Sequence, residues 1–410
     1  MIELIIFSIL GVLIGIITGL VPGLHVNTIL PIIISLVFID PYSLAVFVVS
    51  IAITQVFVGF IPSIFIGAPE EDTALSVLPG HRLLFEGRGY EAIKLTVIGG
   101  ICSLFVTILS IYFLANYFQI LYQVSRPYIQ YLIGSIVLFM LFSEKKFRKI
   151  LLATSIVLIS GLLGILTLSS SIVPQTKVLF PVLTGLFGLS TLIVSMSQKS
   201  KIPDQSEEDE LKISKLDILK SVILGSFAGI SVGFLPAIGV SQAATIVQQV
   251  GGMGEARSFL VTLSSINVAN EIFSLISLFL VGNPRSGASV AIEKILQELT
   301  AYDVLLLIGT ICLASGIAAI ATLFLGSKIP KILVKLNYKY LSLVVIFFIT
   351  SMVAIVTGLM GLLVLFASVS IGILCNNLGV RRSHCMGVLL IPSILFFSGL
   401  NPLIISMLRL

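Results

Sequence analysis

The chain has 410 residues, of which 57% are hydrophobic and only 10% are charged, and its mean hydropathy is +1.16. Soluble globular domains carry about 25% charged residues, so this composition excludes a soluble protein and predicts an all-α polytopic membrane protein. The net charge of +5 comes from Lys and Arg in loops between apolar segments, so it does not call for a nucleic-acid partner. The four cysteines show neither metal-ligand nor disulfide spacing, and no cofactor is expected.

The first apolar segment contains its own helix breaker, in the stretch GLVPGLHVN from Gly19 to Asn27. Proline lacks a backbone donor and glycine is flexible, so Pro22 and Gly23 predict the end of one half-helix, and Asn27 is placed to cap the next. Lipid offers no hydrogen-bond partners, so such helix ends must face a cavity. We therefore expect a binding site here. His25 adds a titratable side chain to it, although a lone histidine is more often structural.

A second interruption follows at GAPEED, residues 67–72, which we call the Gly67 break. Gly67 and Pro69 interrupt an apolar run, and the acids Glu70, Glu71 and Asp72 come directly after them. Acids are stabilised near a helix N-terminus, so a solvated first turn is one interpretation. The other is that an acid inside the membrane has a function, such as ion coupling by Glu70.

The polar stretch after residue 196 divides the chain into two apolar halves. We predict a first membrane repeat at residues 1–196, a charged cytoplasmic linker at 197–216 and a second membrane repeat at 217–410. The repeats are predicted from three matches that occur in the same order in both halves. The first, at offset 214, aligns Gly11, Gly15, Gly19 and Pro22 with Gly225, Gly229, Gly233 and Pro236. The second aligns Gly67-Ala68-Pro69 with Gly282-Asn283-Pro284 at offset 215, and the third aligns IGGIC from Ile98 with IGTIC from Ile308 at offset 210. Ordered matches of this kind predict an internal duplication.

The second half therefore carries matching breaks. At LPAIGVS, Pro236 ends a half-helix, Gly239 follows and Ser241 is the expected cap of the next helix. At GNPRSG, which we call the Gly282 break, the expected site residues are Gly282, Asn283, Pro284, Arg285 and Ser286. Helix N-termini suit anions and free carbonyls suit cations, so four breaks meeting at one cavity predict a small-ion site.

Three polar residues lie in the otherwise apolar stretch SSINVANEIFSLISLFLVG. Asn267, Asn270 and Glu271 are three and four residues apart, so they share one helix face and predict a Na⁺ or H⁺ coupling site. A helix nearer the membrane interface is the alternative interpretation. Glu70 and Arg285 follow the proline of matching breaks, and we hypothesise that they pair, because an unpaired buried charge is costly.

The basic residues indicate how the halves are oriented. The first half has Lys145, Lys146, Arg148 and Lys149 where the second half is uncharged, and the second half has Lys328, Lys331, Lys335 and Lys339 where the first has only Arg126. Basic loops prefer the cytoplasm, so the halves are predicted to be inverted, with the N-terminus outside and the linker cytoplasmic. The two remaining charged groups are predicted to be a cytoplasmic loop (His81, Arg82, Glu86, Arg88) and a topology anchor (Arg381, Arg382, Ser383, His384).

The order and spacing of the four breaks, together with GAPEEDTALSVLPGHRLLFEGRGYEAI from Gly67 to Ile93, resemble the large membrane subunit of tripartite tricarboxylate transporters. The resemblance implies an inverted-repeat carrier that takes up organic anions with Na⁺ or H⁺. It also implies two partners, a small membrane subunit and an extracytoplasmic binding protein. This chain departs from the family pattern at Glu70 and Arg285, where the family has glycine, and at Ala237.

Three alternatives remain open at this point. A lipid or polyprenyl-phosphate carrier would use the same scaffold, with a cavity open to the bilayer. An intramembrane enzyme would need a metal cluster such as Glu70, Glu71, Asp72 and His81, but no metalloprotease, P-loop or nucleophile-elbow motif is present, so we expect no enzymatic activity. A channel is disfavoured, because selectivity filters come from rings of subunits.

Overall fold

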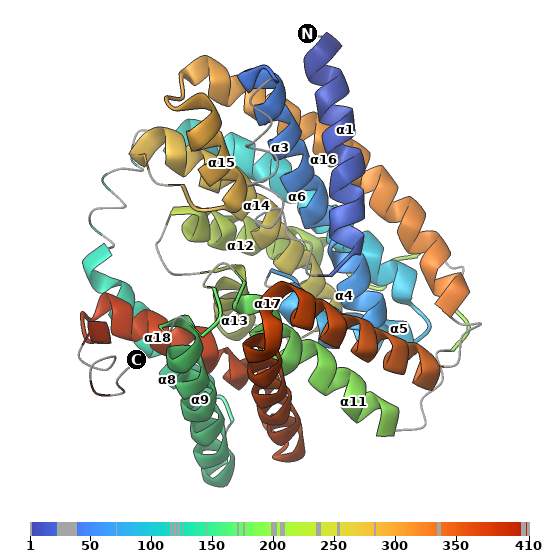
Figure 1. Ribbon diagram of the computed structural model, residues 1–410, viewed down its shortest axis with the longest axis vertical. Coiled ribbons are helices and arrows are strands. Elements are labelled where there is room, and N and C mark those ends of the chain that lie inside the picture. Colours follow the sequence, from blue (N-terminus) through green and yellow to red (C-terminus); the bar gives the residue numbers. More distant parts are fainter. Residues whose placement is uncertain are drawn as a thin grey trace.

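The computed structural model describes residues 2–22, 39–70, 72–114, 117, 120, 124, 126–144, 146–169, 172–174, 177–197, 203–205, 210–234, 239–251, 255–282, 284–333, 338–402 and 407. Some residues of the predicted sites lie outside the described residues: Gly23, His25, Asn27, Glu71, Pro236 and Asn283. Over the described ranges the chain folds into helices and loops with no strand (Figure 1).

The helices of the first half are α1 (Ile2–Leu20), α3 (Pro41–Val58), α4 (Phe60–Ile66), η1 (Ala74–Ser76), α5 (Val77–Phe85), α6 (Gly89–Leu114), η2 (Arg126–Tyr128), α8 (Ile129–Phe142), α9 (Phe147–Leu168), α10 (Leu179–Leu183), η3 (Thr184–Leu189) and α11 (Ser190–Ser197). Those of the second half are α12 (Lys215–Phe234), α13 (Val240–Val250), α14 (Ala256–Val281), α15 (Gly287–Leu296), α16 (Ala301–Leu333), α17 (Tyr338–Asn377), η4 (Arg382–Met386) and α18 (Gly387–Phe397).

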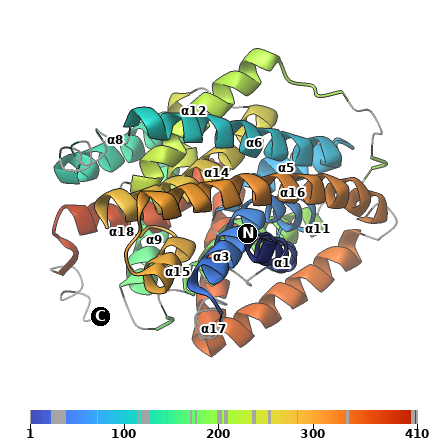
Figure 2. The same ribbon diagram turned by 90° about the horizontal axis from the view of Figure 1, so that it is seen from above.

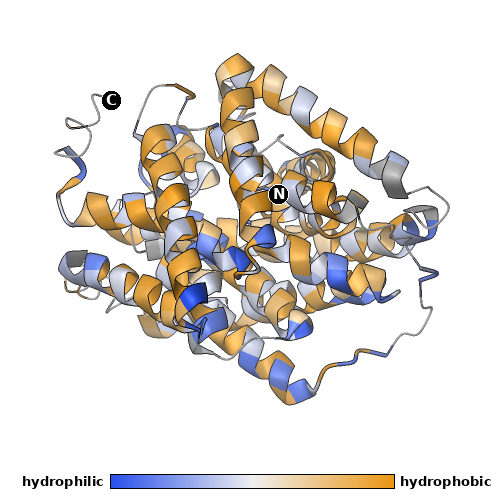
Figure 3. Cartoon of the chain, turned by 90° about the horizontal axis from the view of Figure 1, so that it is seen from below, coloured by the Kyte–Doolittle hydropathy of each residue, from blue (hydrophilic) through white to orange (hydrophobic). Residues whose placement is uncertain are grey.

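The long helices are apolar enough to cross a bilayer. Within the described residues, eight helical segments have the length and composition of a membrane span. Large apolar side chains such as Tyr112, Leu109 and Leu359 are exposed on the outside of the molecule, where water would be unfavourable and lipid is not. Figure 3 shows hydrophobic residues along most of these helices. The predicted all-α polytopic membrane protein is confirmed.

The small-residue faces of α1 and α12 pack against α3 and α14 in matching ways. A Cβ on Gly11 would meet the carbonyl oxygen of Phe47 at 2.6 Å, and one on Gly225 would meet that of Thr262 at 2.6 Å. Phe47 and Thr262 are 215 positions apart. The glycines thus let two parallel helix pairs approach closely, as small residues do in membranes.

The contact partners of the other two glycine pairs repeat in the same way. Gly15 packs on Ile51 and Thr54, and Gly19 packs on Val58; the partners in the second half are Ile266 and Ala269 for Gly229, and Phe273 for Gly233. Each second-half partner again lies 215 positions after its first-half counterpart.

In the centre of the molecule, each half packs one of its helices against helices of the other half. α6 of the first half packs on α14 and α12, whereas α16 of the second half packs on α3 and α1. Figure 2 shows α6 and α16 running alongside each other across the molecule. The Ser103 hydroxyl donates to the carbonyl of Ser265 at 2.8 Å, and the Ser265 hydroxyl donates to that of Gly99 at 3.0 Å. Both faces of α14 are therefore buried by helices.

A second group of helices lies beside this centre. α9 packs on α18, and α17 packs on α10, η3 and α11. Gly358 interrupts α17 with φ 69° and ψ −166°, a conformation that L-residues rarely adopt, and Figure 1 shows the two parts of α17 pointing in different directions. The sequence pattern missed this kink, because Gly358 lies in an unbroken apolar run.

Candidate functional site

The Gly67 and Gly282 breaks have the same backbone geometry. α4 ends at Gly67 with φ 67° and ψ 30°, and α14 ends at Gly282 with φ 64° and ψ 29°. Both glycines are left-handed helix caps, a conformation that costs glycine little and other residues more. The amide of Gly282 donates to Leu278 O, and the amide of Ala68 donates to Pro62 O. Each long helix therefore stops at the glycine that the sequence marked.

The acidic end of the Gly67 break contacts the centre of the molecule. Half-buried Glu70 accepts a hydrogen bond through Oε2 from Gln55 Nε2 on α3, at 3.0 Å, and its own amide donates to Thr73 Oγ1 at 3.1 Å. The carbonyl of Asp72 accepts from Asn267 Nδ2 on α14, also at 3.0 Å. Glu70 and Asp72 are therefore half-buried beside α3 and α14, and neither lies in a helix. The pairing of Glu70 with Arg285 stays a hypothesis.

The Gly282 break leads into the N-terminus of α15. Ser286 is the N-cap, and its hydroxyl accepts from the amide of Ser289 at 3.2 Å. The same hydroxyl donates to Oε1 of Glu271 at 3.1 Å. The amide of Arg285 donates to Ser289 Oγ at 2.9 Å. A carboxylate of α14 thus lies at the N-terminus of α15, where the partial charge of the helix is positive.

The predicted polar face of α14 touches both breaks. Asn267 is hydrogen-bonded to the Gly67 break, and Glu271, one turn later, is hydrogen-bonded to the Gly282 break. Asn267 is only 2% exposed, and its Oδ1 has no hydrogen-bond partner among the described residues. Asn270, between the two contacts, is half-buried. The face of α14 thus carries an amide oxygen without a described partner and a carboxylate one turn later, which are the kinds of oxygen that bind cations.

The breaks after α1 and α12 agree in part with the prediction. α1 ends at Leu20, directly before Pro22, as a proline breaker requires. α13 begins at Val240, and its N-cap is Gly239, whose amide donates to Gln242 Oε1 at 2.7 Å. The expectation that Ser241 caps this helix was wrong, because Ser241 lies inside the first turn, where it is buried.

Two groups predicted to be solvated are partly buried. The loop prediction for residues 81–88 was wrong, since His81 and Arg82 lie on α5, and both His81 and Arg88 are buried. The predicted anchor at residues 381–384 was also wrong in part, since Arg382 and His384 are buried between helices. A single sequence cannot show whether a basic residue that follows an apolar segment is buried or lies in an exposed loop.

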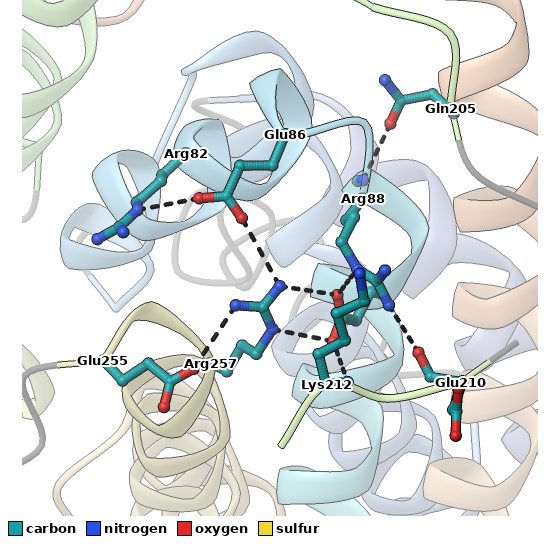
Figure 4. Close-up of polar contacts among 10 residues, drawn as sticks. Arg82, Glu86, Arg88, Gln205, Glu210, Lys212, Glu255 and Arg257 are labelled. Atoms are coloured by element: carbon teal, nitrogen blue, oxygen red, sulfur yellow. Dashed lines mark hydrogen bonds and ion pairs between the residues drawn. The ribbon is translucent and has the colours of Figure 1, made fainter. Parts of the chain in front are cut away.

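A buried ionic cluster joins both halves and the linker (Figure 4). Glu91 of α6 accepts hydrogen bonds from Arg88, from Arg257 of α14 at 3.0 Å and from the amide of Lys212 at 2.8 Å. Arg257 also lies 3.6 Å from the carboxylate of Glu86. Sequence reasoning missed this cluster, because its members are spread over more than 160 positions and belong to no local pattern.

Among the described residues, no three His, Cys, Asp or Glu side chains gather as metal ligands. The metal-cluster enzyme alternative therefore finds no support in that part of the chain.

Comparison with known proteins agrees with the resemblance seen in the breaks. A model of the tripartite tricarboxylate transporter TctA family matches residues 5–387. The chain is 32% identical over 411 residues to the uncharacterized protein MJ1079 of Methanocaldococcus jannaschii, covering 96% of this chain and 98% of that protein. No solved structure matches. Because the family match extends over both halves and all four breaks, the chain belongs to the tripartite tricarboxylate transporter TctA family.

Proposed function

We propose that this protein is a secondary carrier for a small organic anion of the carboxylate class, coupled to Na⁺ or H⁺. Membership of a transporter family supports a transport function. One structural observation supports the coupling of transport to a cation: the polar face of α14 contacts both breaks. A cation held by this face would bring the two breaks together and neutralise charge before an anion enters. Transport would then require both ligands.

The proposed cation site consists of carboxylates and amides. Asn267 Oδ1 and the carboxylate of Glu271 supply oxygen ligands for Na⁺, or Glu271 carries a proton. Asn270 and Glu70 complete the site in this proposal, Glu70 being positioned by Gln55. The four side chains are buried or half-buried, so the electrostatic interactions of the two carboxylates are stronger than they would be in water.

The proposed anion site consists of backbone donors at the helix ends. The N-termini of α15 and α13 begin at the Gly282 break and after Gly239, and both carry partial positive charge. The proposed substrate-binding residues in the described part are Pro22, Gly67, Pro69, Gly239, Ser241, Gly282, Pro284, Arg285 and Ser286. Gly23, His25, Asn27, Pro236 and Asn283 belong to the same proposal.

We further propose that the halves are inverted repeats. The 215-residue spacing of the glycine contacts and the packing of α6 and α16 against the other half support a twofold relation between residues 1–196 and 217–410. The charge pattern supports the inversion, with the N-terminus outside and the linker at 197–216 in the cytoplasm. Protease added to sealed inside-out vesicles should then cleave this linker, and cleavage only in right-side-out vesicles would contradict the orientation.

The carrier proposal is tested by thermal unfolding of the purified protein with di- and tricarboxylates, each with and without Na⁺. A ligand at 100 times its dissociation constant stabilises the folded state by about 2.7 kcal/mol. We expect a carboxylate to raise the unfolding temperature in a Na⁺- or pH-dependent way. A shift with polyprenyl phosphate and none with carboxylates would favour the lipid carrier instead. Loss of uptake in cells lacking a small membrane subunit or a binding protein would identify the partners.

A further inference from the structure

His81 is a buried imidazole whose ring nitrogens have no hydrogen-bond partner among the described residues. Its side chain is 4% exposed, and neither Nδ1 nor Nε2 makes a hydrogen bond in the described part of the structure. The ring packs edge-on against Phe85, with centroids 6.2 Å apart, and lies against the Gly67 break. A Cβ on Gly67 would be 2.9 Å from Cε1 of His81. A polar ring held this tightly without partners requires an explanation.

Arg382 is a buried guanidinium with no carboxylate partner among the described residues. It is 8% exposed, and Nη1 donates to Phe187 O at 3.3 Å, to Ser190 Oγ at 3.2 Å and to Thr191 Oγ1. These acceptors are all uncharged, and no described carboxylate lies within ion-pair distance of Arg382. Nε and Nη2 make no hydrogen bond to the described residues, so two adjacent donors of the fork are available. The nearby carboxylate of Glu144 is bonded to His384 instead.

The helical segment η3–α11 brings Arg382 and His81 to the same break. Its Leu192 contacts Gly67 next to the His81 ring, and Thr191, the preceding residue, binds Arg382. Thr184 on the same segment donates to Pro69 O at 3.3 Å. Residues 184–189 form a π-helix, a feature that is frequent at functional sites.

The electrostatics of this side of the break favour an anion. Burial and the positive charge of Arg382 lower the pKa of His81 to about 4, so the ring is neutral at pH 7 and offers one N–H donor. A guanidinium without a counter-charge is costly to bury, and a carboxylate would supply two oxygens for Nε and Nη2. On the other side of the break, the carboxylate of Glu70 accepts from Gln55 of α3, and the backbone carbonyl of Asp72 accepts from Asn267 of α14.

We propose that Arg382 and His81 bind a carboxylate group of the transported anion beside the Gly67 break. This inference rests on the proposed function and adds two side chains to the backbone donors named above. The fork of Arg382 binds the two carboxylate oxygens, and His81 donates a third hydrogen bond. The Gly67 break then separates an anion-binding face, formed with η3–α11, from the cation-binding face on α3 and α14.

The test is calorimetric titration of the purified protein with citrate and succinate, with and without Na⁺. We expect Arg382→Gln to weaken the binding of the carboxylate by about 100-fold and His81→Gln by about 10-fold. Two substitutions next to these residues are controls: Arg381→Gln and Arg82→Gln each change an exposed arginine and should leave affinity within about twofold. The Na⁺ dependence of the residual binding should be unchanged in His81→Gln, because the cation face is intact.

The outcomes separate the two proposals. Wild-type protein that binds no carboxylate contradicts the proposed function and this inference with it. Wild-type binding with unchanged affinity in both variants overturns the inference alone. If Arg382→Gln does not fold, Arg382→Lys and His81→Gln carry the test: the lysine keeps a charge but not the fork, so binding should weaken. Unchanged affinity in these two variants overturns the inference.

Discussion

Arg257 in the second half lies 3.0 Å from Glu91 in the first half, measured from Nε to Oε1. Glu91 also accepts the amide of Lys212, so one carboxylate connects α14, α6 and the end of the linker. Three donors, from Arg88, Arg257 and the Lys212 amide, satisfy this buried carboxylate. Glu91 thus forms one buried connection between the two halves and the linker.

Replacing Glu91 by Gln should loosen this connection. Arg88 and Arg257 would lose their shared counter-charge, and breaking a buried pair in this way costs about 3–5 kcal/mol of unfolding free energy. We expect a lower unfolding temperature and faster proteolysis of the linker. Glu210→Gln is the matched control, because Glu210 is exposed and uses only its carbonyl oxygen in contact with Arg88. Equal stability of the two variants would show that the cluster does not hold the linker.

Gly229 should tolerate no side chain. A Cβ there would lie 2.4 Å from the carbonyl oxygen of Ile266, so Gly229→Ala forces α12 away from α14. Overpacking of this kind costs about 1–3 kcal/mol, and the unfolding temperature should fall. Gly309→Ala is the control: no atom lies within 4 Å of the added methyl, and alanine favours the helix. A fall of equal size in both variants would show that the close contact with Ile266 does not set the cost of the substitution.

Glu271→Gln should uncouple anion binding from the cation. The amide keeps an oxygen for the Ser286 hydroxyl, so the Gly282 break should stay folded, but the charge and the titratable proton are lost. We expect the Na⁺ or pH dependence of carboxylate uptake in proteoliposomes to disappear, with uptake reduced at least tenfold. Glu298→Gln, an exposed acid beyond α15, should behave as wild type. Uptake by Glu271→Gln with unchanged cation dependence would remove Glu271 from the site.

The pair formed by Glu144 and His384 predicts a loss of stability in acid. Burial raises the pKa of Glu144, but hydrogen bonds from the Arg381 amide at 3.1 Å and from His384 at 2.9 Å outweigh it, so the pKa lies below the ordinary 4.5. Burial also lowers the pKa of His384 below the ordinary 6.5. Both pKa values are depressed by folding, so both contributions are present at neutral pH and are lost as the pH falls.

The unfolding temperature should therefore decrease from pH 7 towards pH 4, first as the pH drops below 6.5 and further below 4.5. The His384→Gln variant should lack the first part of this decrease, because no imidazole is left to protonate. A variant with the same pH profile as wild type would show that other groups control acid stability.

The sequence alone predicted the features that depend on local chemistry. Low charge and long apolar segments required membrane helices, and left-handed glycines at Gly67 and Gly282 ended helices where the pattern placed the breaks. The glycines that match between the halves in sequence lie on the packing faces of α1 and α12. Backbone breaks and helix faces follow from residues that are close in the chain, so a single sequence is sufficient to find them.

The cap of α13 shows the limit of local reasoning. Ser241 and Gly239 are both acceptable caps, and the side chain of Gln242 decided for Gly239 by bonding its amide. In the same way, the spacing of Asn267 and Glu271 predicted that they share one helix face, but it could not predict that they contact two different breaks. That arrangement depends on α14 passing between segments that are far apart in the chain.

The tertiary structure alone decided which charged residues are buried and what they face. Arg82 and Arg382 look alike in sequence, yet Arg82 is exposed beside Glu86 while Arg382 lies among the uncharged acceptors of η3–α11. Glu91 and Arg257 meet only because α6 of one half packs on α14 of the other. Composition and periodicity determined that the chain enters the membrane and where its helices break. Which polar groups meet inside was decided by long-range packing, because desolvation and charge depend on neighbours in space.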